Sequence, residues 1–231
     1  ALEAKDRVMD LIEFFSFDDD VKLEDCTAET ELYQLIGYQA PTKIASFLTD
    51  ESNVPDINRA KQISINNEPI VIVRTGLTKI PIYQILALNS DKAIHSKITG
   101  AGVPFVGTKA LEIFRIENGV PAFGSELSER FNPIEAGLSN VISFDKGCYV
   151  GQEVVARLNT YDKVKRQLIR LNWNKPGIQK GDIIFSEDQE IGEVTSCVKK
   201  TNEIYIGLGY LARNSKLNDV KIGLKRVSAK V

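Results

Sequence analysis

A change in the pattern of apolar residues near Asp162 limits the fold more than any other feature of the sequence. Before it, some stretches repeat apolar residues at helical spacing and others are short β-rich runs. After it, only short β-type runs follow, separated by glycine, proline and asparagine. We therefore predict an α+β fold with two domains, an α+β domain over residues 1–162 and a small C-terminal β-barrel over residues 163–231.

Individual elements follow from the same patterns. Helices are expected at 8–15, 28–36, 42–48, 90–97 and 108–116. Strands are expected at 21–25, 69–74 and 82–88, and in the barrel at 165–171, 182–185, 191–198 and 204–208. Asn89 or Ser90 would cap one helix and Thr108 another, and Asn118-Gly119 would end the latter.

Charge and hydrophobicity exclude some classes of protein. Lys+Arg 29 against Asp+Glu 31 leaves a net charge near zero, and 43% of residues are hydrophobic, as in ordinary globular proteins. No apolar run approaches the ~18 residues of a membrane span, so we expect no membrane partner. The chain starts without a methionine or a signal peptide, and we expect that an N-terminal portion is missing. A cytoplasmic location is predicted, or a mitochondrial matrix if the protein is eukaryotic.

Three cysteines, Cys26, Cys148 and Cys197, are widely spaced and odd in number, which favours a reducing compartment over a disulfide framework. His95 is the sole histidine and no Cys-x-x-Cys is present, so we predict no metal site made by this chain alone. An iron–sulfur cluster would need ligands from a second chain or a small molecule. Cys26 and Cys197 stand in alternating contexts typical of small buried apolar residues.

The strongest candidate for chemistry is residues 146–153, Lys-Gly-Cys-Tyr-Val-Gly-Gln-Glu. Gly147 and Gly151 let the backbone turn sharply or approach a ligand, since glycine has no Cβ. Lys146 stands beside Cys148, where a positive charge favours the thiolate that acts as nucleophile or metal ligand. We therefore predict Cys148 and Lys146 as the catalytic pair.

A second candidate is the segment 115–124, which places Glu117 before two glycines and a proline. A carboxylate at a helix end can accept paired N–H donors from a heterocycle, a strong bidentate arrangement. From the local sequence alone, an exposed ion pair with Arg115 or Lys109 is the favoured explanation of Glu117, since such surface pairs are common.

A stripe of basic residues is the third feature. Between 157 and 180 stand seven cations and one anion, Arg157, Lys163, Lys165, Arg166, Arg170, Lys175 and Lys180 against Asp162. Such a stripe could bind nucleic acid or the anionic tail of a ligand, or be a solvated rim of the barrel.

At these patches the chain resembles the YgfZ-type folate-binding proteins, which are relatives of the glycine-cleavage T-protein, an aminomethyltransferase. The segment 146–153 is similar to the YgfZ signature. The segments 115–119 and 132–138 are similar to regions that both branches share. Residues 192–196 and 206–210 resemble the C-terminal barrel of the family.

The resemblance implies tetrahydrofolate or a folate derivative as cofactor. It implies that Glu117 contacts the pterin ring and that Arg166 helps to hold the folate, and we expect Arg157, Tyr149 and Gln152 to contribute to the same site. In the YgfZ branch, the cysteine that matches Cys148 supports iron–sulfur enzymes, including those that modify tRNA. The expected partners are therefore folate and iron–sulfur proteins or assembly factors.

Three functions follow from this reading. The first is a folate-binding protein that supports iron–sulfur cluster assembly or repair, without classical enzyme activity. The second is folate-dependent aminomethyl transfer, for which the cysteine segment would have no task. The third is RNA binding through the basic stripe. The folate species, the client proteins and the oligomeric state do not follow from the sequence.

Overall fold

The computed structural model describes residues 4–16, 19–48, 54–65, 67–88, 93–160, 163–217, 220–223 and 227–231. The chain forms two compact units, Ala1–Phe105 and Val106–Val231. Asp162, where the sequence pattern changes, lies outside the described residues, and the division into domains 1–162 and 163–231 stays a prediction. Helices and antiparallel sheets occur in both units, so the predicted α+β class is confirmed.

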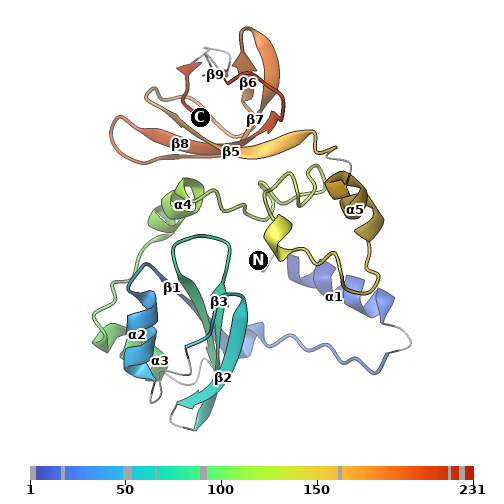
Figure 1. The fold of residues 1–231 in the computed structure, drawn as a ribbon. Helices are drawn as coiled ribbons and strands as arrows, with labels where there is room; N and C mark the ends of the chain where they lie inside the picture. Colours follow the sequence, from blue (N-terminus) through green and yellow to red (C-terminus); the bar gives the residue numbers. More distant parts are fainter. Residues whose placement is uncertain are drawn as a thin grey trace. The chain divides into compact units, whose positions relative to one another are not determined.

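The first unit is built on a four-stranded antiparallel sheet in the order β1-β4-β3-β2. The strands are β1 (Thr30–Ile36), β2 (Arg59–Ile65), β3 (Glu68–Thr75) and β4 (Ile82–Leu88). Helices α2 (Ala40–Phe47) and α3 (Ala93–Gly100) lie on one side of the sheet (Figure 1). The core between them contains fully buried Ile44, Ile72, Ile85 and Ile94. The strands expected at 69–74 and 82–88 are present as β3 and β4, and the two pair with each other.

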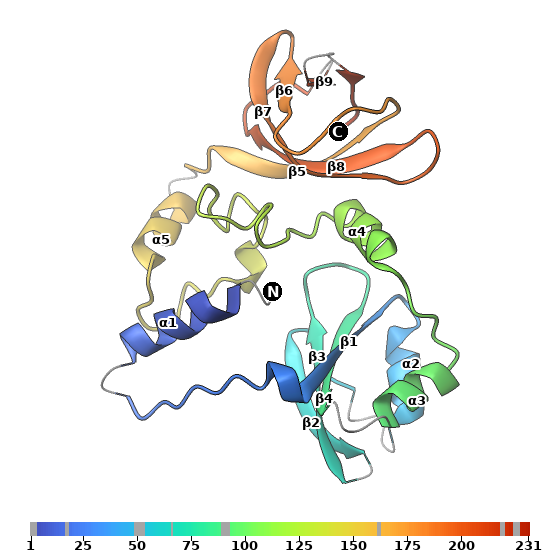
Figure 2. The ribbon, with the colours of Figure 1, turned by 180° about the vertical axis from the view of Figure 1, so that it is seen from behind.

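Helix α1 (Lys5–Phe15) precedes this sheet, and an extended segment and a short 3-10 helix, η2 (Thr27–Glu29), lead from it to β1 (Figure 2). The ammonium of Lys5 lies 2.6 Å from Asp25 Oδ2, which ties the start of α1 to that segment. The hydrogen bond from Lys5 holds the pKa of Asp25 well below its usual range.

Two predictions in this unit are wrong. Residues 28–36 form mainly strand β1 rather than a helix, because each residue of the strand pairs across to β4, from Thr30 with Leu88 to Ile36 with Ile82. Residues 21–25 have no strand partner and Val21 is exposed. A short apolar run does not distinguish a helix from a strand, so pairing decided both cases. Strand β2 was not expected.

The second unit begins with α4 (Thr108–Glu117), η4 (Ser139–Val141) and α5 (Gln152–Thr160). Six antiparallel strands follow in the order β10-β9-β6-β7-β8-β5. They are β5 (Arg166–Trp173), β6 (Ile183–Ser186), β7 (Gln189–Lys199), β8 (Tyr205–Ala212), β9 (Val220–Ile222) and β10 (Val227–Ser228).

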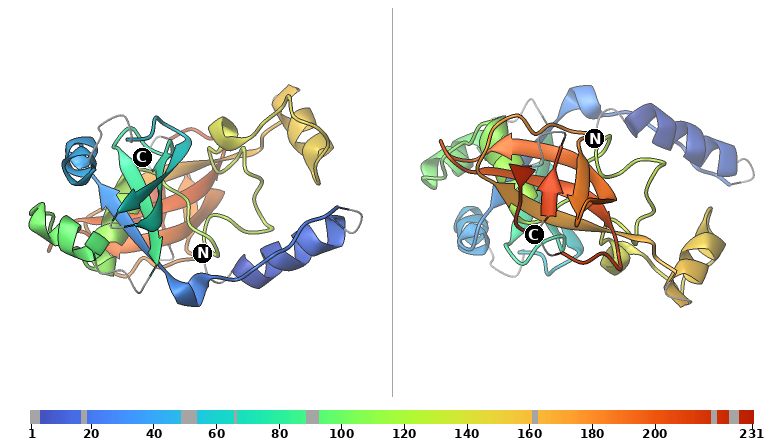
Figure 3. Two further views of the ribbon diagram at one scale, coloured as in Figure 1. Left: turned by 90° about the horizontal axis from the view of Figure 1, so that it is seen from below. Right: turned by 90° about the horizontal axis from the view of Figure 1, so that it is seen from above.

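This sheet curls until its two ends meet, as the right-hand view of Figure 3 shows. Asn172 of β5 and Lys230, just after β10, exchange two backbone hydrogen bonds of 2.9 Å each. Closing the sheet in this way leaves fewer unpaired backbone groups at its edges. Trp173, Ile184, Leu211 and Ile222 fill the inside. The predicted C-terminal barrel is confirmed by this arrangement.

Helix α4 ends as its sequence predicts but starts differently. Gly119, just beyond the helix, has φ +66, a left-handed conformation that ends helices and that glycine adopts without steric cost. At the other end, Gly107 rather than Thr108 occupies the N-cap position, and no side chain caps the helix. The caps expected from Asn89 or Ser90 lie outside the described residues.

Candidate functional site

The end of α4 holds Glu117 against the barrel. Arg170 of β5 donates a hydrogen bond of 2.8 Å from Nη1 to the backbone oxygen of Glu117. The side-chain carboxylate forms an ion pair with Lys200, in the turn between β7 and β8, through Glu117 Oε1. The two side chains remain 39% and 40% exposed. Glu117 thus has a fixed backbone and a carboxylate that a ligand can reach.

The ion pairs expected for Glu117 with Arg115 or Lys109 are not the ones seen, because Arg115 binds other carboxylates. Its Nη1 lies 2.9 Å from Glu126 Oε2, and its Nε donates to Glu112 at 2.8 Å. Burial disfavours the charge of Arg115, but the hydrogen bond with Glu112 and the charge of Glu126 outweigh it and raise its pKa.

Glu126 is the centre of a buried polar network. Its side chain is 0% exposed. Thr195 and Ser196 of β7 donate to Glu126 Oε1 at 2.6 and 2.7 Å. Arg115 Nη1 and the backbone N–H of Ala122 donate to Glu126 Oε2 at 2.9 and 3.0 Å. Every carboxylate oxygen is therefore satisfied, which is the condition for burying a charge.

Sequence reasoning missed Glu126. The residues next to it in the chain, Ser125 and Leu127, form no pattern that predicts a buried carboxylate. A usable signal is the pair Thr195-Ser196, two adjacent hydroxyls that follow Val194 and precede Cys197-Val198 in β7. The bulge between Val194 and Ser196 lets both hydroxyls face the same carboxylate.

Cys148 lies in an irregular segment that precedes α5, and its side chain is exposed. The Lys146 ammonium lies 4.8 Å from the centre of the Tyr149 ring, a cation–π contact. Gln152 Oε1 accepts a hydrogen bond of 3.2 Å from the backbone N–H of Tyr149 and so shapes the turn into α5. Within the described residues, no hydrogen bond or ion pair links this segment to Glu117, so the two candidate groups stay separate predictions.

Arg166 lies at the start of β5 and lines a pocket of about 430 Å³. Arg130, Glu190 and Glu193 line the same pocket. The guanidinium groups of Arg166 and Arg130 lie 5.3 and 5.2 Å from the ring centre of Phe131. Arg130 is also paired with Glu193. The structure does not bring Arg166 into contact with Glu117, and its role in folate binding stays a prediction.

Arg157 is an exposed residue of α5, and its guanidinium pairs with Glu153 at 3.2 Å. Other members of the basic stripe are engaged elsewhere, since Arg170 binds the backbone of Glu117 and Lys180 binds Gly124 O at 2.9 Å. Nucleic-acid binding by the stripe stays a prediction.

In the described part of the chain, no group of three or more His, Cys, Asp or Glu side chains is arranged to hold a metal ion. None of the helices described there combines the length and the apolar character needed to cross a membrane.

A family model described as the GCVT N-terminal domain matches residues 2–146. The chain belongs to this family. The match includes Glu117, the Arg115–Glu126 pair and the first residue of the cysteine segment. The GCVT classification confirms the superfamily that the sequence resembles, while the YgfZ branch within it remains a hypothesis.

Two relatives of the chain support its membership of the GCVT family. A chloroplastic protein from Arabidopsis thaliana that is named as a transferase is 31% identical over 92% of this chain and 50% of its own length. An aminomethyltransferase from Aquifex aeolicus is 34% identical over 54% of this chain and 35% of its own. The GCVT chain thus spans half or less of the length of these two relatives.

The crystal structure of the glycine cleavage system aminomethyltransferase T from Bartonella henselae has the same fold. It superimposes with a TM-score of 0.64 at 21% identity, over 87% of this chain and 58% of that one. The likeness reaches beyond the residues that the GCVT N-terminal model matches.

Proposed function

We propose that this chain binds a tetrahydrofolate and that Glu117 holds its pterin ring. The observation that carries the proposal is the contrast within the end of α4. Its backbone is fixed to the barrel by Arg170, while the Glu117 carboxylate is partly exposed. A binding carboxylate needs both properties, since a fixed position lowers the ordering cost of binding and exposure gives access.

The residues present fit the chemistry of a pterin. A pterin edge presents an amino group and a ring N–H side by side, and a carboxylate offers two acceptor oxygens at matching spacing. Tetrahydrofolate, when bound, would supply a carrier for one-carbon groups. The part of this chain is to bind and orient the ring at Glu117.

Calorimetric titration with folic acid, a stable pterin of the same edge, tests the proposal. Glu117→Gln replaces one acceptor by a donor and should weaken binding about tenfold to a hundredfold. Glu203→Gln is a matched control, because Glu203 is an exposed glutamate close in sequence to Lys200. Equal affinity of Glu117→Gln and the unchanged protein would remove Glu117 from the site.

For Cys148 we propose a role in the assembly or repair of iron–sulfur clusters, including those of tRNA-modifying enzymes, with the thiolate as ligand or exchange group. The exposure of the thiol in an irregular segment supports this role, since reactive cysteines are accessible ones. The cluster would be cargo, and a partner would supply its remaining ligands.

Cells that carry Cys148→Ser should lose most of the activity of an iron–sulfur enzyme that modifies tRNA. Cys26→Ser is the control, because Cys26 lies in the first unit and is also exposed, which shows that the burial expected for it was wrong. If both variants leave that enzyme activity unchanged, the proposed role of the thiol is wrong.

Aminomethyl transfer is the second candidate, and the name of the Aquifex relative favours it. Glu117 would serve it equally, and Cys148 would have no part. Formation of methylene-tetrahydrofolate from an aminomethyl donor, unaffected by Cys148→Ser, would select this function over the first.

A further inference from the structure

Lys200 was not a candidate from the sequence, yet it is the side chain that meets Glu117. It stands in the turn between β7 and β8, and its backbone N–H donates to Ile204 O at 2.9 Å. The N–H of Thr201 donates to the same oxygen at 3.1 Å. Because this turn is fixed, the Lys200 ammonium starts from a defined position beside the carboxylate.

The pair has a donor and acceptor order that a ligand can match. Glu117 offers two acceptor oxygens, and Lys200 adds a cationic donor next to Oε1. Read from one side, the row is acceptor, acceptor, donor. A 2-amino-4-oxo pterin edge presents the complementary row, with the 2-amino group and ring N3–H as donors and the 4-oxo oxygen as acceptor.

We infer that Lys200 is a specificity-determining residue that recognises the 4-oxo group of the pterin held by Glu117. The inference rests on the proposed folate site and names which pterins it selects. A 4-amino pterin places a donor where the 4-oxo acceptor stood, and its ring N3 carries no hydrogen. Neither group then matches Glu117 or Lys200, and the site should reject it.

Discrimination of this kind is large when a fixed polar group is left without its partner. The ion pair itself is half-exposed, so it adds little to the stability of the fold. Lys200 can therefore be changed without unfolding the barrel, whose core residues lie elsewhere.

The test compares the affinities of folic acid and aminopterin, which differ only in having an oxo or an amino group at position 4. The unchanged protein should bind folic acid at least about tenfold more tightly. Lys200→Gln should weaken folic acid binding about tenfold and leave aminopterin binding unchanged, which reduces the preference about tenfold. Lys200→Arg keeps a cationic donor and should retain the preference.

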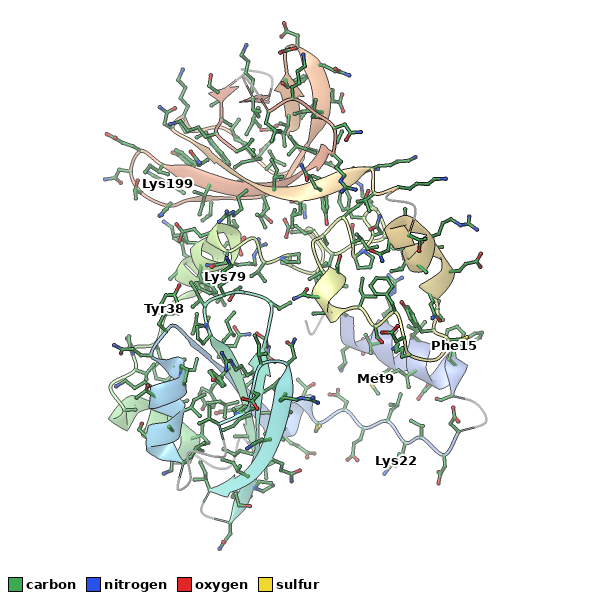
Figure 4. All side chains as sticks on the ribbon, in the orientation of Figure 1. Met9, Phe15, Lys22, Tyr38, Lys79 and Lys199 are labelled. Carbon is green, nitrogen blue, oxygen red and sulfur yellow. The ribbon has the colours of Figure 1, made fainter. Side chains whose placement is uncertain are left out.

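Lys199→Gln is the matched control. Lys199 is the last residue of β7, labelled in Figure 4, and is exposed. Lys199→Gln removes the same charge as Lys200→Gln but leaves the ion pair between Lys200 and Glu117 in place. It should therefore leave the affinities for both compounds unchanged. An equal effect of both substitutions would reduce the role of Lys200 to general attraction of the folate carboxylates, and the inference would fail.

The other outcomes are also decisive. If Glu117→Gln weakens folic acid binding as expected but Lys200→Gln leaves the preference intact, only the inference about Lys200 is wrong. If Lys200→Gln instead binds folic acid more tightly, the ion pair blocks the Glu117 carboxylate. That result would also overturn the inference about Lys200. If the unchanged protein binds neither compound, the proposed folate site fails together with the inference.

Discussion

The end of α4 and the loop that follows it each carry a glutamate next to the barrel, and the two carboxylates are held in opposite ways. Glu126 is fully buried and accepts hydrogen bonds from Arg115, Thr195, Ser196 and a backbone N–H. Glu117 is partly exposed and pairs with Lys200. The first carboxylate has no capacity left for a ligand, whereas the second can exchange partners. A carboxylate that is buried, with both oxygens already hydrogen-bonded, therefore has a structural role. A carboxylate that is exposed and paired only at the surface can bind a ligand.

Replacing Glu126 should give the largest loss of stability. In Glu126→Gln, Arg115 loses the buried negative charge that it pairs with, and an amide N–H₂ replaces one acceptor oxygen of the network. Removing one partner of a buried ion pair costs about 3–5 kcal/mol. Urea unfolding followed by circular dichroism measures this change in the free energy of unfolding. Glu112→Gln is the control, because Glu112 also binds Arg115 but is 38% exposed. Equal costs would mean that burial is not what distinguishes Glu126.

Thr195 tests the same network from the barrel side. In Thr195→Val, the shape is kept but the O–H that donates to Glu126 at 2.6 Å is lost. A buried acceptor left short of a donor costs about 1–3 kcal/mol. Thr108→Val, at an exposed position where no side-chain cap bond exists, should leave the free energy of unfolding nearly unchanged. A neutral Thr195→Val would show that Ser196, Arg115 and the Ala122 N–H satisfy the carboxylate without Thr195.

The difference between these glutamates also marks the limit of sequence reasoning. Glu117 could be named because it ends a periodic helix before Gly119, a local pattern. The barrel runs could be named because their alternation and turn residues are local too. Glu126 could not, since its partners Thr195 and Ser196 are distant in the chain. The same holds for Lys200, and for residues 30–36, whose strand is defined by pairing with β4.

The cysteines extend the comparison of buried and exposed groups. Cys148 is exposed, while Cys197 is half-buried and its Sγ lies 3.5 Å from Ile178 O. Burial raises the pKa of Cys197, so its thiolate should remain scarce until the pH is clearly above the ordinary thiol value of about 8.5. Iodoacetamide at pH 8, followed by mass spectrometry, should label Cys148 at least about tenfold faster than Cys197. Labelling of Cys197 should increase as the pH rises further. Equal rates at pH 8 would mean that the barrel opens near β7.

The smallest effect on stability should come from Glu117 itself. Its ion pair with Lys200 is partly exposed on both sides, and exposed pairs contribute about 0–1 kcal/mol and weaken with salt. Glu117→Gln, Lys200→Gln and the double variant should therefore unfold at nearly the same urea concentration, and the residual coupling should shrink in 0.5 M salt. The hydrogen bond from Arg170 goes to the backbone oxygen of Glu117, so it survives the substitution. If Glu117→Gln instead cost as much as Glu126→Gln, the carboxylate would be structural, and the folate site would lose the observation on which it rests.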